Sequence, residues 1–253
     1  MQIHTVPAFQ DNYLWVLSEG SRAAVVDPGD AAPIQRFLSE HGLELCAILA
    51  THHHADHIGG VPALVKHWRC PVFGPAHDGI SGLDRTLVEA DRVEVPGIGV
   101  EFSVLDVPGH TAGHIAYVGP DVAFVGDTLF ACGCGRLFEG TAAQMTQSLG
   151  KLASLPEATR AYCAHEYTLS NIRFAQAVEP GNARLAQRKE RESKRRERGE
   201  PTVPTTIGEE RATNPFLRCT EAEVIASAER HAGRKLATTV EVFSEIREWK
   251  NNF

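Results

Sequence analysis

Five side chains that can ligate a metal ion lie within six consecutive residues of this chain. They are the imidazoles of His52, His53, His54 and His57 and the carboxylate of Asp56. Neutral imidazole nitrogen and carboxylate oxygen are the ligands that zinc, iron and manganese accept. Two histidines two residues apart in an extended segment can converge on one ion, and the aspartate with the last histidine can reach a second. A single histidine would favour a surface residue without function, but five possible ligands in one segment favour a metal site.

The sequence around this segment predicts that it follows a buried strand. The apolar run 45–50 is typical of such a strand, and residues 63–68 are predicted to form a helix with Pro62 in its first turn. Binding and catalytic groups of α/β sheets gather at the carboxyl ends of strands. We therefore expect the histidine-rich segment to be a loop at a strand end.

Three later strands are predicted to deliver the same kinds of side chain. The strand 100–107 leads to His110 and His114, the strand 122–125 leads to Asp127, and the strand 159–164 leads to His165. This repetition indicates that separate loops contribute to one site.

The composition of the chain limits the classes of function. The 253 residues can form one large domain and a small one, and they are 43% hydrophobic and 23% charged, as in ordinary soluble globular proteins. The net charge of −7 argues against a general affinity for nucleic acid. No apolar run approaches the roughly 20 residues of a membrane span, and no secretory signal is visible. We therefore expect a monomeric cytoplasmic protein with no nucleic-acid or membrane partner.

The six cysteines are expected to be thiols rather than disulfides. They form no CxxC pair, and several lie in apolar runs, where cysteine is usually a small buried hydrophobic residue. Cys132-Gly133-Cys134 could bind a metal ion, but a tight turn at the glycine is the preferred interpretation.

The first two thirds of the chain have the element order of an α/β protein. Strands are predicted over 13–17 and 23–26, then a helix over 32–41 that ends at Gly42, and further strands within 71–125.

Helices are predicted to dominate the rest of the chain. They cover residues 141–153, 169–177, 183–198, a segment through residue 231 that begins with a Thr220/Glu223 capping box, and 236–249. Residues 201–215 carry three prolines and are predicted to be an extended connection. We place a domain boundary at residue 165, with residues 1–165 as a catalytic domain and residues 166–253 as a helical domain.

Residues 183–198 contain eight Arg and Lys residues interleaved with three glutamates. This run could bind nucleic acid. We prefer a solvated helix with ion pairs between residues four apart.

Four motifs in this order resemble the metallo-β-lactamase superfamily. They are Thr-His-His-His-Ala-Asp-His at 51–57, Gly-His-Thr-Ala-Gly-His at 109–114, Gly-Asp-Thr at 126–128 and the late His165. Segments 133–140, 165–168, 178–182 and 214–218, together with Arg247 and Lys250, narrow the resemblance to the glyoxalase II (hydroxyacylglutathione hydrolase) family. It covers essentially the whole chain and implies an α/β fold, an αββα sandwich followed by an α-helical domain that binds substrate.

The resemblance also implies the ligands of two divalent metal ions. One ion would be held by His52, His54 and His110, the second by Asp56, His57 and His165, and Asp127 would bridge them. Zinc is the expected metal, with iron and manganese as alternatives. Asp27 and Thr51 are candidates for fixing the imidazole tautomers, or else turn and cap residues. His53 and His114 are predicted to support the loops rather than to ligate.

The family's glutathione contacts fall on Arg136, Phe138, Tyr167, Arg247 and Lys250. Many relatives carry lysine and tyrosine at the first two positions, so the positive charge is kept while one hydroxyl is lost. Arg247 and Lys250 could also be explained as cations at a helix C-terminus.

The resemblance implies hydrolysis of a glutathione thioester such as S-D-lactoylglutathione, the second step of methylglyoxal detoxification. Two metals about 3.5–4 Å apart can share one water and lower its pKa toward about 7, so the resulting hydroxide attacks the carbonyl. Asp56 and Asp127 would act at this centre, with Asp56 orienting the water. No serine or cysteine nucleophile is required.

Three other functions remain open on the sequence alone. A persulfide dioxygenase of the same superfamily would use a single iron, and the second ligand set of Asp56, His57 and His165 argues against it. A nuclease would use residues 183–198 to bind phosphates. A metal-binding scaffold would bind metal without turnover.

Overall fold

The computed structural model describes all 253 residues, which form two compact units. The first unit comprises residues 1–106 and 111–126, and the second comprises residues 107–110 and 127–253. The elements of the first unit are β1 (Gln2–Ala8), β2 (Asn12–Glu19), β3 (Arg22–Val26), α1 (Ala31–His41), β4 (Glu44–Leu49), α2 (Ala55–Ile58), α3 (Val61–Trp68), β5 (Val72–Pro75), β6 (Arg85–Leu87), β7 (Arg92–Val95), β8 (Val100–Asp106), β9 (Ile115–Gly119) and β10 (Val122–Gly126).

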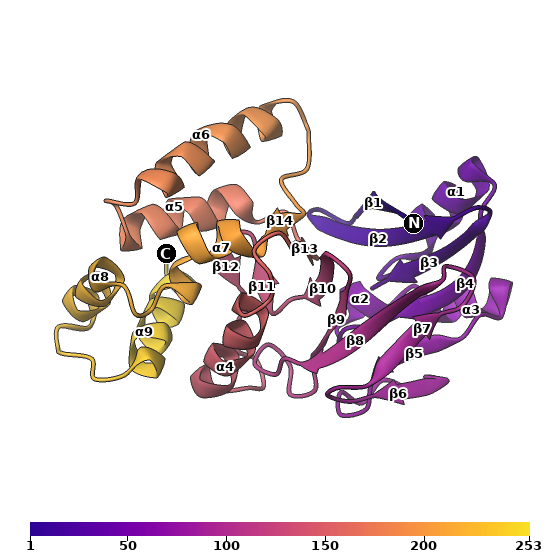
Figure 1. Cartoon of the computed structure of the whole chain (residues 1–253), viewed down its shortest axis with the longest axis horizontal. Helices are drawn as coiled ribbons and strands as arrows, with labels where there is room; N and C mark the ends of the chain where they lie inside the picture. Colours follow the sequence, from indigo (N-terminus) through magenta and orange to yellow (C-terminus); the bar gives the residue numbers. More distant parts are fainter. The chain divides into compact units, whose positions relative to one another are not determined.

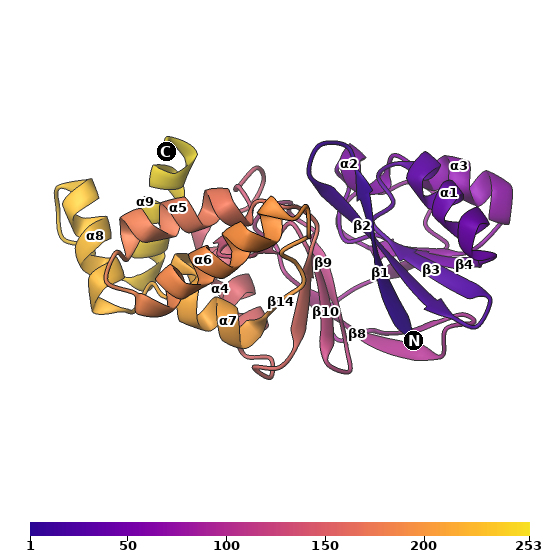
Figure 2. The same cartoon turned by 90° about the horizontal axis from the view of Figure 1, so that it is seen from above.

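One sheet of the first unit has the strand order β1-β2-β3-β4-β5-β6 (Figure 1). Its first three strands are antiparallel, and the strands from β3 to β6 are parallel. Helices α1 and α3 cover one face of this sheet (Figures 1 and 2). Side chains alternate along a strand, so Val25 and Ile48 pack with Ile34, Leu38 and Leu64 of the helices in one buried cluster.

The opposite face of that sheet meets the antiparallel strands β7, β8, β9 and β10. The hydroxyl of Tyr117 on β9 donates to the carbonyl oxygen of Ala50 (2.9 Å), which follows β4, and lies 3.3 Å from the carbonyl oxygen of Phe73 on β5. Phe102 and Phe124 pack edge to face beside this tyrosine. The end of β4, where the histidine-rich segment begins, is thus held by helices on one face of the sheet and by Tyr117 on the other.

The elements of the second unit are β11 (Leu129–Phe130), β12 (Gly133–Cys134), α4 (Ala142–Ala153), β13 (Arg160–Cys163), α5 (Thr168–Val178), α6 (Ala183–Glu197), β14 (Thr205–Thr206), α7 (Ile207–Thr213), the 3₁₀ helix η1 (Pro215–Leu217), α8 (Ala222–Ala232) and α9 (Thr239–Asn251). Strands β11 and β12 form a short hairpin, and β13 pairs with β14. Helices α5 and α6 lie side by side, as do α8 and α9 (Figures 1 and 2). No helix of the chain combines the length and the apolar character that a membrane span needs.

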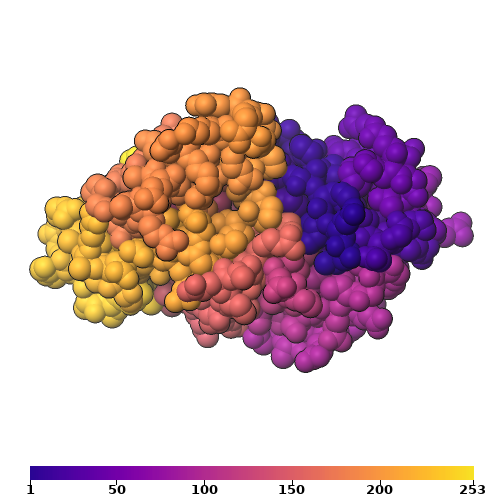
Figure 3. Space-filling model, turned by 45° about the horizontal axis from the view of Figure 1, so that its top comes forward, coloured from indigo at the N-terminus to yellow at the C-terminus, as the bar shows by residue number.

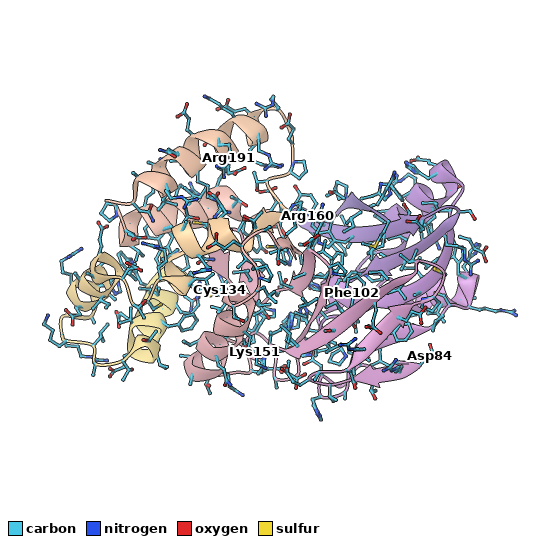
Figure 4. The ribbon with its side chains drawn as sticks, in the orientation of Figure 1. Asp84, Phe102, Cys134, Lys151, Arg160 and Arg191 are labelled. Atoms are coloured by element: carbon cyan, nitrogen blue, oxygen red, sulfur yellow. The ribbon has the colours of Figure 1, made fainter.

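The structure confirms most of the predicted elements and the state of the cysteines. Gly42 ends α1 in the left-handed conformation, Pro62 lies in the first turn of α3, and all six cysteines are buried thiols. Helix α6 is at the surface (Figure 3), with Arg191 projecting from it (Figure 4). Its cations pair with acids, as between Lys194 and Glu190 four residues apart (2.6 Å), so the ion-paired helix is confirmed.

Two predictions about local structure were wrong. Residues 201–215 are not simply extended, because they contain β14 and α7. The prolines of the segment lie outside α7, and the Thr206 side chain caps the helix by accepting from the Glu209 N–H. The histidine-rich segment is also not all loop, since α2 forms within it.

Two further features occur at other residues than predicted, the turn predicted at Gly133 and the capping box predicted at Thr220. The residue with positive φ is Cys132 (φ 61°), while Gly133 pairs with Phe130 in the hairpin. Helix α8 starts after Glu221 without a side-chain cap, because Glu223 instead accepts from the backbone N–H of Gly181 (2.9 Å). A capping box forms instead between Thr238 and Glu241 of α9.

These two threonines give a matched test of helix capping. Thr238→Ala should lower the free energy of unfolding by about 1 kcal/mol, because the N-cap hydrogen bond at Glu241 is lost. Thr220→Ala should change it by less than about 0.5 kcal/mol, because the exposed Thr220 caps nothing. Chemical denaturation of both variants measures the difference, and equal losses would contradict it.

Candidate metal centre

The first unit brings together the four ligands predicted from the histidine-rich segment. His52 follows β4, and the ligand atoms of His52 and His54 lie within 4.8 Å of each other. The rings of His52 and His57 are 4.0 Å apart, and His57 Nε2 lies 3.5 Å from Asp56 Oδ2. His52 and His57 are almost fully buried, whereas the Asp56 side chain is 42% exposed. Asp56 and the half-buried His54 are thus the members of this group that solvent can reach.

Asp27 fixes the orientation of two of these imidazoles. Its carboxylate accepts from the Thr51 backbone N–H (2.7 Å), the Thr51 hydroxyl (2.7 Å) and Nδ1 of His57 (3.1 Å). Because the Thr51 hydroxyl donates its proton to Asp27, its oxygen accepts from Nδ1 of His52 (3.0 Å). Both imidazoles therefore carry their proton on Nδ1 and present Nε2 as the ligand atom. The predicted supporting role of Asp27 and Thr51 is confirmed.

A glycine brings the loop before α1 against the backbone of this segment. A Cβ atom on Gly29 would lie 1.7 Å from the carbonyl oxygen of Asp56, so no larger residue fits there. The N–H of Gly60 donates to the carbonyl of Pro28 (2.9 Å) in the same contact. The Asp27-Pro28-Gly29 turn therefore sets the position of α2 as well as that of the imidazoles.

Asp78 and Asn12 support the segment, although neither was predicted from the sequence. Asp78 accepts from the backbone N–H of His53 (2.7 Å), Nδ1 of His53 (2.9 Å) and the N–H of Gly113 (2.9 Å). Burial acts to raise the pKa of this carboxyl, but the hydrogen bonds outweigh burial and lower it. Asn12 donates to Asp56 Oδ2 (3.0 Å). His53 thus has a loop-supporting role, as predicted.

The second unit brings the other three predicted ligands together. His110 Nε2 lies 3.3 Å from Asp127 Oδ2, and His165 Nε2 lies 3.3 Å from Asp127 Oδ1. All three residues are buried, and His110 donates from Nδ1 to the carbonyl of Arg136 (2.9 Å). One carboxylate thus has an imidazole beside each of its oxygens, which is the arrangement of a carboxylate that bridges two ions.

The donor sets fit divalent ions. Two ligands that each lie about 2.0–2.2 Å from one tetrahedral ion are separated by roughly 3.3–3.6 Å. The imidazole–carboxylate separations of 3.3 and 3.5 Å fall within this range and are long for hydrogen bonds. Nitrogen and oxygen donors with fixed tautomers suit zinc, iron and manganese.

Three further predicted residues lie beside histidines of the predicted ligand set. His114 is buried and stacks on His52, with ring centroids 4.6 Å apart, in keeping with a supporting role. The ring of Tyr167 stacks on His165 (4.8 Å, 5° between planes), and the exposed ring of Phe138 lies 5.2 Å from His110. Aromatic side chains therefore line two of the ligand imidazoles in the second unit.

A group of cations lies near the end of α9. Burial, followed by the charges of Arg247, Arg173 and Arg136, holds the pKa of the Lys250 ammonium below its ordinary value. Arg247 is buried and donates to the carbonyl of Cys134 (2.8 Å) and to Asn251 Oδ1 (3.1 Å). Arg173 was missed by the sequence analysis. Like charges gathered in this way favour an anionic ligand.

Comparison with known proteins assigns the class. Residues 7–165 match the family model described as "Metallo-beta-lactamase superfamily". Among solved structures, that of ETHE1 from Myxococcus xanthus is similar in fold, with a TM-score of 0.68 and 24% identity, over 99% of this chain and 98% of the other. TTHA1623, solved in a di-iron-bound form, has a TM-score of 0.61 and 27% identity over 86% of this chain and 100% of the other. The chain is a metallo-β-lactamase superfamily protein with a C-terminal helical domain.

The rest of the chain and its full-length relatives narrow the assignment. Residues 166–253 match the model "Hydroxyacylglutathione hydrolase C-terminus". A protein named hydroxyacylglutathione hydrolase from Nitrosomonas eutropha is 51% identical to this chain, over 100% of this chain and 99% of the relative. Another protein of that name, from Alkalilimnicola ehrlichii, is 55% identical, over 99% of this chain and 98% of the relative. The chain therefore belongs to the hydroxyacylglutathione hydrolase family.

The role of Asp27 can be tested by changing one oxygen to nitrogen. Asp27→Asn should weaken metal binding about 10- to 100-fold, because an amide nitrogen would face donors where the carboxylate now accepts three hydrogen bonds. Competition with a chromophoric chelator measures this affinity. Asp30→Asn is the matched control, since asparagine caps α1 as well as aspartate does. Equal affinities in the two variants would contradict the role.

Proposed function

We propose that this chain is a metal-dependent thioester hydrolase that cleaves S-D-lactoylglutathione to glutathione and D-lactate. The observation that carries the proposal is the group of cations around Lys250, in the same compact unit as the buried imidazole–carboxylate set of His110, Asp127 and His165. Glutathione offers two carboxylates to the cations, and its thioester carbonyl is the group on which the metal centre would act. The full-length relatives named hydroxyacylglutathione hydrolase support the same activity.

We propose two divalent ions per chain, zinc in the first instance. The ligands would be His52, His54 and His110 for one ion and Asp56, His57 and His165 for the other, with Asp127 shared. The fixed Nδ1 protons and the 3.3–3.5 Å donor separations support this assignment. When bound, such a pair supplies Lewis acidity for a water molecule and for the thioester carbonyl.

Thioester hydrolysis needs a group that accepts a proton from water and a leaving group that departs readily. The partly exposed carboxylate of Asp56 would accept the proton of the attacking water, and the hydrogen bond from Asn12 supports this role. A thiolate leaves readily because its pKa is about 8.5, so no strong general acid is needed. The cysteines are unsuited to covalent catalysis, since burial raises the pKa of their thiols, that of Cys132 to about 12.

The cations and the aromatic side chains would bind the peptide. A glutathione carboxylate beside Lys250, Arg136 and Arg173 would relieve their mutual repulsion, and Phe138 offers an exposed ring beside His110. Tyr167 would contact the peptide from its place on His165. Arg247 is buried and donates to the Cys134 carbonyl, so its positive charge would attract the substrate carboxylate without direct contact. We assign these contacts mainly to a substrate domain of residues 166–253, and the metal chemistry to residues 1–165.

The location and the oligomeric state expected from the sequence remain proposals. We propose a monomer that works in the cytoplasm. Sedimentation of the purified protein and fractionation of the cells that produce it are the direct measurements.

The activity is tested by the loss of thioester absorbance with S-D-lactoylglutathione. Wild-type protein loaded with metal should turn over, and Lys250→Ala should raise KM at least about tenfold with a smaller change in kcat, because one charged hydrogen bond to substrate is lost. Lys189→Ala removes the same charge from the exposed face of α6 and should behave as wild type. Absence of wild-type turnover would contradict the proposal, and an unchanged KM in Lys250→Ala would contradict the contact.

The lowered pKa of Lys250 predicts a dependence of KM on pH. A bound carboxylate stabilises the charged ammonium, so affinity is full below the lowered pKa and declines as pH rises through it, before an ordinary lysine would titrate. Lys250→Arg stays charged and should keep KM constant over the same range. A parallel rise of KM in both proteins would contradict this explanation.

A further inference from the structure

Side chains from three helices hold the backbone of the β11–β12 hairpin. Asn214, just after α7, donates from Nδ2 to the carbonyl of Gly133 (2.9 Å), and the Phe130 carbonyl lies 3.3 Å from the same nitrogen. Asn171 of α5 donates to the carbonyl of Ala131 (3.1 Å). The Cys132 N–H donates to Glu210 of α7 (2.7 Å), and the Cys134 carbonyl accepts from Arg247 of α9. Each residue from 130 to 134 thus has a backbone atom within hydrogen-bond distance of a side chain from α5, α7, α9 or the residue after α7 (Figure 4 labels Cys134).

The groups that hold the hairpin are themselves fixed. Glu210 is fully buried and accepts from the guanidinium of the equally buried Arg188 (2.6 Å) and from the Thr205 hydroxyl (2.6 Å). Its second oxygen accepts from Cys132 and from Asn214 Nδ2 (2.9 Å). Asn214 Oδ1 in turn accepts from the Phe216 N–H (3.1 Å). Both oxygens of Glu210 thus accept hydrogen bonds from buried groups, and this network favours one register of the hairpin.

The hairpin leads directly to two proposed metal ligands. Asp127 precedes β11, and the N–H of Gly135, after β12, donates to the Thr128 carbonyl (3.3 Å). A Cβ on Gly135 would lie 2.0 Å from the Asp127 carbonyl oxygen and 3.0 Å from Nδ1 of His110. The next residue supplies the carbonyl that accepts the His110 Nδ1 proton. A shift of the hairpin would therefore move Asp127 and release the tautomer of His110 together.

We propose that Asn214, with Asn171 and Glu210, is a positioning residue for the metal ligands Asp127 and His110, acting through the β11–β12 hairpin. The inference rests on the metal centre of the proposed function. It assigns to the helical elements a role in holding the metal ligands, in addition to any contact with substrate.

The test is the rate at which metal-loaded protein releases its ions to excess chelator. Asn214→Ala should release metal about tenfold faster than wild type, because supports of this kind typically change metal affinity 10- to 100-fold. The ligand-field spectrum of the cobalt(II)-substituted variant should also shift, and kcat should fall more than KM rises. An Asn214→Ala protein with wild-type release and spectrum would overturn the inference.

Thr238→Ala is the control for loss of stability alone. It removes the N-cap of α9 in the same unit but touches no hairpin atom, so it should lower the melting temperature while keeping wild-type metal release and spectrum. Equal metal release by Thr238→Ala and Asn214→Ala at equal stability would overturn the inference.

Asn171→Ala covers the case in which Asn214→Ala does not fold. It removes a single hydrogen bond to the hairpin and should speed metal release in the same direction, and wild-type release would overturn the inference. Metal release is read without any thioester. A wild-type protein that retains metal but hydrolyses no glutathione thioester would therefore contradict only the proposed function.

Discussion

The candidate metal centre depends on one constraint: the imidazole nitrogen that faces a metal must carry no proton, and a fixed acceptor for the Nδ1 proton leaves Nε2 free for that role. Asp27 satisfies this requirement directly for His57 and through the Thr51 hydroxyl for His52. The carbonyl of Arg136 satisfies it for His110. These acceptors come from a turn after β3 and from the segment after β12, so the fold must place distant backbone accurately before any ion binds. The glycines at 29 and 135 permit the close approaches on which this placement depends.

The sequence predicted what is encoded locally. Apolar runs located β2, β3, β4, β8 and β10, and the ligand types followed from residues grouped at the ends of those runs. The supporting contacts could not be predicted in the same way, because they join residues far apart in the chain. Asn12 and Asp56 are separated by 44 positions, His53 and Asp78 by 25, and Asn214 and Gly133 by 81. An asparagine or aspartate in a loop has many possible partners, and only the folded backbone selects one.

Local rules also failed where a tertiary contact competed with them. Thr220 and Glu223 have the spacing of a capping box, but the Glu223 carboxylate bonds to Gly181, and the same motif succeeds at Thr238 and Glu241, where the glutamate stays with its own helix. Arg247 illustrates the same competition at the site. The family resemblance implied a substrate contact for Arg247, and its guanidinium bonds to the Cys134 backbone and lies over the Phe216 ring. It therefore joins helix α9 to the hairpin.

The burial of all six cysteines bears on the chemical environment in which such a hydrolase works. Acyl thioesters exchange with exposed thiolates, and released glutathione forms mixed disulfides with thiols that become oxidised. Burial raises the pKa of every thiol in this chain and removes each from solvent. An acyl thioester that bound to this protein would therefore meet no exposed thiolate of the chain that could compete for the acyl group.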